Sequence, residues 1–114
     1  MSHLSILPTV LRDADLLAEA LQDLGLDPQR GGSLRGFADD RVSVSLWVSL
    51  GEGERLGWRP QGDGSLALVG DLQRLGRSRP LQQLIGRITR AYATRLALRE
   101  AARELSQAQV ELVA

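Results

Sequence analysis

The chain offers few side chains that could carry chemistry near neutral pH. His3 is the only histidine among 114 residues, and there is no cysteine. Without cysteine, a thiol nucleophile and disulfides are excluded, and a zinc site built from histidine and cysteine cannot form within one chain. A serine–histidine–aspartate triad would have to recruit His3 from the N-terminal end of the sequence. We therefore expect no catalytic residue, no metal and no cofactor.

The charged residues are balanced in number but not in position. All 14 basic residues are arginines, and the absence of lysine excludes a Walker A phosphate loop. Residues 12–40 hold seven acidic residues and three arginines, a net charge of −4, whereas residues 72–105 hold eight arginines and two glutamates, a net charge of +6. Opposite charges of this kind either pair within the molecule or form a basic surface. The candidate partner-binding arginines in the basic segment are Arg87, Arg90, Arg95 and Arg99.

Residues 42–48 read Val-Ser-Val-Ser-Leu-Trp-Val, the clearest structural pattern in the chain. Successive side chains of a strand point to opposite faces, so this alternation predicts one half-buried antiparallel strand with four apolar residues on a single face. Trp47 falls on the serine-rich face. It either covers that face beneath another segment or stays exposed as an anchor for a second protein, because tryptophan is enriched at interface hot spots.

Two stretches have helical spacing. Residues 13–24 predict an amphipathic helix with Asp13 as its N-cap and Gly25 as its left-handed C-terminal cap. The period changes at Leu72, and from Leu81 to Leu105 the apolar residues recur in alternating threes and fours, which predicts a second helix beginning at Ser78 or Arg79. Arg95 interrupts this stripe. It lies either at the helix edge with its head in water, or where the helix passes beyond the sheet and meets a partner.

The remaining segments predict short strands separated by turns that contain glycine. Residues 5–10 contain Pro8 and are expected to form at most an edge strand. Asp71 follows a predicted strand and is expected to cap the next turn or to pair with an arginine such as Arg35. Residues 110–113 are expected to add a last strand. We therefore predict a single α+β domain spanning residues 1–114, with an antiparallel sheet of four to six strands, two helices on one face and the order β-α-β-β-β-β-α-β.

Five short motifs occur in order along the sequence, at residues 1–5, 35–37, 56–58, 68–72 and 88–93. On these motifs the chain, from Met1 to about Leu105, resembles the hypothetical chloroplast reading frame thirty-five family, also called the domain of unknown function 1257. Its members occur in cyanobacteria and in some algal plastids. The resemblance implies a small soluble protein of a photosynthetic cell and supplies no biochemical activity. It also marks His3, Arg35 and Asp71 as the best polar candidates for a site.

Three functions remain open at this point. The first is a non-enzymatic accessory protein that binds another protein, or a second copy of itself, through the arginine-rich second helix, the Trp47 face or an open sheet edge. The second is a nucleic-acid-binding protein that uses the arginines of residues 74–103. The third is a small-molecule site near His3, Arg35 and Asp71.

The sequence also bears on location. The first five residues lack the charged region and apolar run of a signal peptide. No window approaches the roughly 20 apolar residues of a membrane span. We therefore expect a protein of the cytoplasm or its stromal equivalent.

Overall fold

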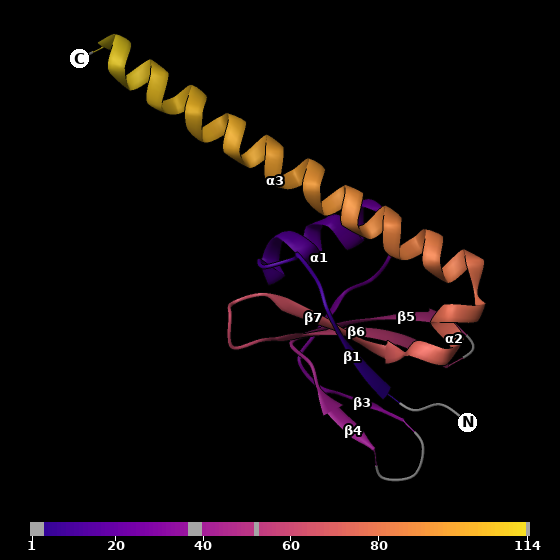
Figure 1. The fold of residues 1–114 in the computed structure, drawn as a ribbon. Helices are drawn as coiled ribbons and strands as arrows, with labels where there is room; N and C mark the ends of the chain where they lie inside the picture. The colour runs from indigo at the N-terminus through magenta and orange to yellow at the C-terminus, as the bar shows by residue number, and fades with distance from the viewer. Residues whose placement is uncertain (1–3, 37–39, 52, 114) are drawn as a thin grey trace.

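The structure, a computed structural model, describes residues 4–36, 40–51 and 53–113, and it confirms the predicted α+β class. Five antiparallel strands form the main sheet in the order β1-β7-β6-β5-β2, and two more strands, β3 and β4, pair separately (Figure 1). The strands are β1 (Leu4–Pro8), β2 (Gln29–Arg30), β3 (Ser33–Arg35), β4 (Arg41–Ser43), β5 (Leu46–Gly51), β6 (Glu54–Pro60) and β7 (Leu66–Asp71). The helices are α1 (Ala14–Asp23), α2 (Leu72–Arg77) and α3 (Arg79–Val113).

The first helix follows the prediction closely. Asp13 is the N-cap of α1, and its carboxylate accepts a hydrogen bond from the Leu16 N–H at 3.0 Å. This bond satisfies one of the backbone donors that a helix start leaves free. Gly25 follows the C-cap with a φ of 79°, a left-handed conformation that glycine adopts without steric cost. The predicted edge strand is also confirmed, because β1 pairs only with β7 and ends at Pro8.

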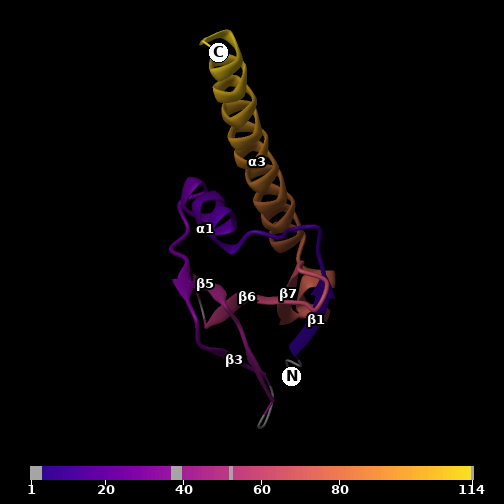
Figure 2. The ribbon, with the colours of Figure 1, turned by 90° about the vertical axis from the view of Figure 1, so that its left-hand side faces the viewer.

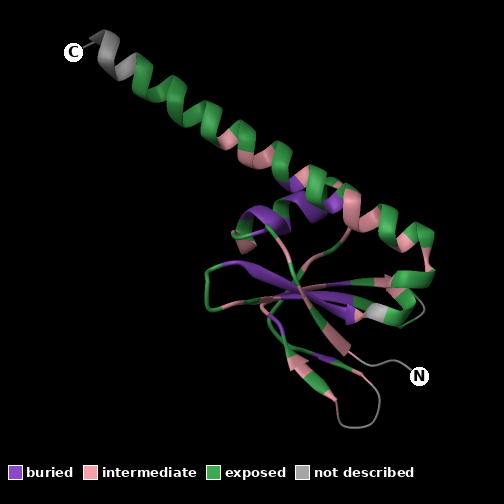
Figure 3. Cartoon of the chain, in the orientation of Figure 1, coloured by how far each residue is buried: buried purple, intermediate pink, exposed green. Residues whose placement is uncertain are grey.

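Both long helices cover the same face of the main sheet, as predicted. Leu17 and Leu21 of α1 and Ile88 of α3 are buried in one cluster with strand residues such as Leu46 and Trp58. Figure 3 shows this buried layer between the sheet and the two helices. Each fully buried leucine or isoleucine contributes roughly 1.5–3 kcal/mol to folding, so this layer is the main source of stability in the fold.

The prediction of one strand over residues 42–48 is wrong, because the chain bends between Val44 and Leu46. β4 ends at Ser43 and pairs with β3, whereas β5 begins at Leu46 and joins the main sheet. At the bend the Ser45 N–H donates to the Trp58 carbonyl at 2.9 Å, and the Val44 N–H donates to the Gly32 carbonyl at 3.0 Å. The four apolar residues therefore do not share a face.

The bend divides the apolar residues between two clusters. Leu46 and Val48 belong to the core under the helices, whereas Val44 packs with Leu34 and Val69 in a second, smaller cluster. Gly57 makes this arrangement possible. A Cβ at that position would lie 2.7 Å from Val44 Cγ1 and 2.9 Å from Leu34 Cδ1, so only glycine lets these side chains approach the sheet.

The expected last strand at residues 110–113 is also wrong, because α3 continues as a helix to Val113. This helix has 35 residues and is about 52 Å long at about 1.5 Å per residue. Figures 1 and 2 show its first half lying against α1 and the sheet, and its second half projecting away from the rest of the protein. Residues 100–108 are all exposed to solvent. Within the described part of the chain, nothing covers residues 100–108.

None of the helices in the described residues combines the length and the apolar composition that a membrane span requires.

Candidate functional site

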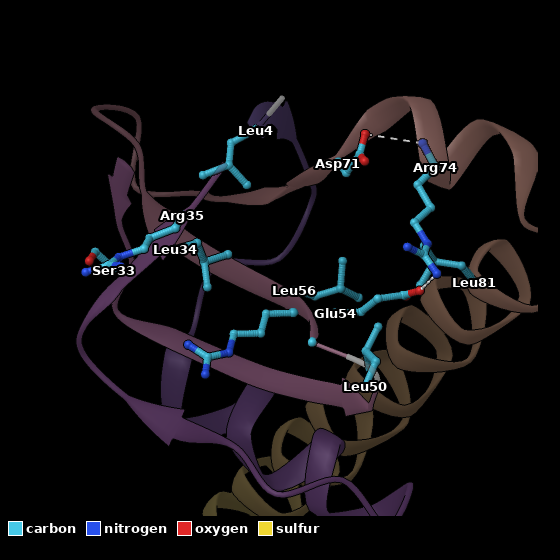
Figure 4. A pocket seen from close by; sticks show the side chains of 12 residues that line it. Leu4, Ser33, Leu34, Arg35, Leu50, Glu54, Leu56, Asp71, Arg74 and Leu81 are labelled. Atoms are coloured by element: carbon cyan, nitrogen blue, oxygen red, sulfur yellow. Dashed lines mark hydrogen bonds and ion pairs between the residues drawn. The ribbon is translucent and has the colours of Figure 1, made fainter. Parts of the chain in front are cut away.

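A hollow with a volume of about 700 Å³ lies at one end of the main sheet. It is formed by β1, β3, β5, β6, α2 and the start of α3 (Figure 4). Its walls combine leucines with arginines and two acidic residues: Leu4, Ser33, Leu34, Arg35, Leu50, Gly53, Glu54, Arg55, Leu56, Asp71, Arg74 and Leu81. An apolar wall with a few charged groups is the usual composition of a small-molecule site.

Three of the charged groups in this hollow are already engaged. Asp71 is the N-cap of α2, and its Oδ1 accepts from the backbone N–H groups of Gln73 at 3.1 Å and Arg74 at 3.3 Å. The Arg74 guanidinium forms an ion pair with Glu54 of β6. The predicted capping role of Asp71 is therefore confirmed.

The structure brings two of the three small-molecule candidates to the same hollow. Arg35 and Asp71 both line it, from β3 and from the end of β7. Figure 4 shows them at opposite sides, with the Arg35 side chain extending toward Ser33 and away from Asp71. His3 lies outside the described residues. The expected pair of Asp71 with Arg35 does not occur, because the Asp71 carboxylate caps α2 instead.

Trp47 is half-buried beside the second cluster, next to Leu34 and Val44. The guanidinium carbon of Arg55 lies 4.5 Å from the centre of its ring, which is a cation–π contact. The residue therefore covers the sheet face opposite the two long helices. Of the two predicted alternatives, this position fits the covering role.

Arg95 and Arg99 bind the acidic first helix rather than a free surface. Arg95 donates to both carboxylate oxygens of Asp23, at 2.6 and 2.7 Å, and to Glu19 at 3.0 Å. Arg99 donates to the Asp13 carboxylate at 2.8 Å. The interruption of the apolar stripe at Arg95 is thus explained by a two-pronged ion pair between α3 and α1.

These ion pairs shift the titration of the groups they join. The hydrogen bonds from Arg95 hold the pKa of the Asp23 carboxyl below its ordinary value of 3.8. The hydrogen bond from Arg99, helped by the Leu16 N–H, lowers the pKa of Asp13 from 3.8 in the same way. Both carboxylates therefore stay charged throughout the neutral range.

Arg87 and Arg90 are exposed and lie on the outer surface of α3. Together with Arg79, Gln82, Gln83 and Gly86 they line a shallow recess of about 480 Å³. All the side chains that line it are polar and three are cationic. The recess is thus suited to a carboxylate or phosphate group.

The predicted apolar stripe along α3 is present, but its last part is exposed to solvent instead of being packed against the rest of the chain. Leu98 is 66% exposed and Leu105 is 63% exposed. Ala101 and Ala108 are exposed as well, and the four residues follow one another at intervals of three, four and three. We call Leu98, Ala101, Leu105 and Ala108 the α3 seam. A heptad count along residues 91–112 could have found this seam.

The chain was compared with known families, curated proteins and solved structures. The family model described as "Protein of unknown function (DUF1257)" matches residues 20–111. Neither the search of curated proteins nor the search of solved structures found a match. The matched range runs from α1 into the last turns of α3, so it includes the recess, the α3 seam and every lining residue of the hollow except Leu4. By this match the chain belongs to the DUF1257 family of proteins of unknown function.

Proposed function

We propose that the protein is a non-enzymatic accessory protein that binds another protein through the α3 seam. The observation that carries this proposal is the exposure of Leu98 and Leu105, 66% and 63%, on a helix that projects beyond the rest of the chain. A scattered exposed leucine needs no explanation, but a continuous apolar line on a projecting helix is typical of a helix-binding surface.

The energetics of the helix support the same proposal. Helices in proteins gain most of their stability from packing of an apolar face. Residues 100–108 continue α3 but are all exposed, so no packing within the described part of the chain stabilises these nine residues. A partner that covers the seam would supply the missing burial.

The cellular setting is a further part of the proposal. The resemblance to the chloroplast reading frame family supports a photosynthetic cell, in its cytoplasm or stroma. A natural setting for the test is therefore a cyanobacterial cell.

The test is affinity capture with three tagged forms of the full chain: wild type, a Leu98→Glu/Leu105→Glu variant, and an Ala93→Glu control. Ala93 is exposed on α3 but lies off the seam. We expect a specific protein to be retained by the wild type and the control and lost with the seam variant, while all three give the same helical circular dichroism. The same captured proteins with all three forms would contradict the proposal.

A second candidate function is favoured by one observation. Arg35 and Asp71 line the same hollow of about 700 Å³, which supports a small-molecule site with a charged rim and an apolar wall. Its test is native mass spectrometry of the purified chain, which would show a bound molecule that is lost in an Arg35→Ala variant. A bare chain mass in both forms would count against this site.

A further inference from the structure

We infer that the occupant of the α3 seam is the seam of a second copy of this chain, paired in the antiparallel direction. This inference rests on the proposed function, because it names the partner of the same surface. Three properties of α3 point to it: the spacing of its apolar residues, the alternation of their sizes and the distribution of charge along the helix.

The spacing is that of a helix pair. Toward the N-terminus, Thr94 and Ala91 continue the spacing of four and three residues. Toward the C-terminus, Leu112 follows Ala108 in the sequence at the next interval of four. A repeat of seven residues over three turns or more keeps one line of side chains turned toward a neighbouring helix. Leu98 to Ala108 are displaced around the helix from the buried Ile88 and Tyr92, and Ala91, partly buried against the same core, lies at the edge of the line. A second helix could therefore lie on the α3 seam while α1 stays in place.

The side chains of the seam alternate between large and small. Leu98 and Leu105 are separated by Ala101, and Leu105 is followed by Ala108. In an antiparallel pair with Leu98 of one helix opposite Ala101 of the other, Leu105 falls opposite the small Thr94 of the second copy. A large residue that faces a small one lets the two helices interdigitate. The seam is therefore complementary in shape to a second copy of itself.

The charge of α3 is polarised along its length, which determines the direction of the pairing. Residues 79–99 contain five arginines and no acidic residue, whereas residues 100–113 contain three glutamates and one arginine. Antiparallel helices place the acidic end of each copy beside the basic half of the other, whereas parallel helices place like charges together. Since like charges across an interface cost affinity, the antiparallel arrangement is favoured.

The same charges select a register. With Leu98 opposite Ala101 of the second copy, the helical repeat brings the position of Arg90, which lines the recess with Arg87, next to position 111 of the second copy, a glutamate in the sequence. A register one heptad further along would instead bring the two Glu104 carboxylates together across the symmetry axis. The first register therefore combines the apolar contacts with opposite charges.

The absence of native cysteine allows a direct test by disulfide cross-linking. One preparation of the full chain carries Ala91→Cys and another carries Ala108→Cys, because these two positions face each other in the proposed register. We expect a disulfide-linked dimer when the two preparations are mixed under mild oxidation, and little from either one alone. Disulfide homodimers of each variant, with no mixed dimer of the two when they are combined, would show a parallel pair and would overturn the inference.

Matched controls complete the experiment. Replacing Ala91→Cys by Ala93→Cys moves the thiol off the seam and should abolish the mixed dimer. Arg90→Glu should weaken association measured by analytical ultracentrifugation by about tenfold or more, and mixing it with Glu111→Arg should restore it. Arg103→Glu makes the same charge change on the far side of the helix and should leave association unchanged.

The outcome also separates this inference from the proposed function. A chain that stays monomeric at every concentration and gives no mixed cross-link overturns pairing with a second copy. If the seam variant nevertheless loses a different captured protein, the proposed function stands with another partner. If neither association is detected, both are refuted.

Discussion

The hydroxyl group of Tyr92 joins the two long helices at one point, and its removal should measurably weaken the fold. The Tyr92 oxygen accepts hydrogen bonds from the backbone N–H groups of Arg12 at 3.1 Å and Asp13 at 3.0 Å. Tyr92 itself is 6% exposed. A single phenol oxygen of α3 therefore satisfies two donors at the start of α1.

The variant Tyr92→Phe keeps the ring in the core and removes only this oxygen. A partly buried donor that loses its partner costs about 1–3 kcal/mol. Because the two N–H groups are near the surface and water can reach them in part, we expect a total loss of about 1–3 kcal/mol in the free energy of unfolding. This is a large fraction of the roughly 5–15 kcal/mol that a domain of this size has.

Urea denaturation followed by circular dichroism measures this loss, with the slope of the transition unchanged. Hydrogen exchange adds a local readout, since the amides of Arg12 and Asp13 should lose protection in Tyr92→Phe. If the variant and the wild type differ by less than about 0.5 kcal/mol, the hydroxyl does not connect the helices in the way described.

Three further predictions concern packing, pH and nucleic acid. Gly57→Ala should destabilise the fold by about 1–3 kcal/mol in urea denaturation, because its methyl group would collide with Val44 and Leu34; an unchanged midpoint would show that the two sheets are not in close contact there. The folded-state pKa values of Asp13 and Asp23 lie below 3.8, so the stability they add is complete above about pH 3.8 and is lost as the pH falls through the folded values. Thermal melts from pH 7 to pH 2 should show a plateau and then a fall, and a fall that begins near pH 6 would contradict this. Titration with DNA and RNA at low salt should show weak binding at most, and tight binding that salt abolishes would favour the nucleic-acid alternative.

Local signals were sufficient to predict the first helix. Asp13 as N-cap, apolar residues at helical spacing and Gly25 after the end all depend on residues within one or two turns of one another. The structure reproduces each of them. The predicted edge strand within residues 5–10, which contains Pro8, also depends on local chemistry, because proline cannot donate to a neighbouring strand.

The break in the predicted strand at residues 42–48 could not be found in the same way. The alternation of valine and serine is identical on both sides of Ser45, and the bend is set by hydrogen bonds to Trp58 and Gly32, which are distant in sequence. One signal was available: a glycine inside a predicted strand, Gly57, often marks a close approach of other groups. That signal says that something packs there but not which residues.

The last segment shows how a short apolar run can mislead. Residues 110–113 suit a strand when read alone, but they also continue the seven-residue repeat of the seam through Leu112. Short runs do not distinguish the two structures, whereas the longer repeat does. The pairing of Arg95 with Asp23 was foreseen only as a balance between an acidic and a basic segment, because charge counts do not identify partners.

The central claim is that the projecting half of α3 is covered by the same half of a second copy of the chain. Hydrogen exchange of the backbone amides of residues 100–112 in the full chain, measured across a range of protein concentrations, tests it most directly. We expect protection that rises with concentration and disappears in Leu98→Glu/Leu105→Glu, because an uncovered helix end of this length opens readily. Exchange that is the same at every concentration and in both forms would contradict the claim.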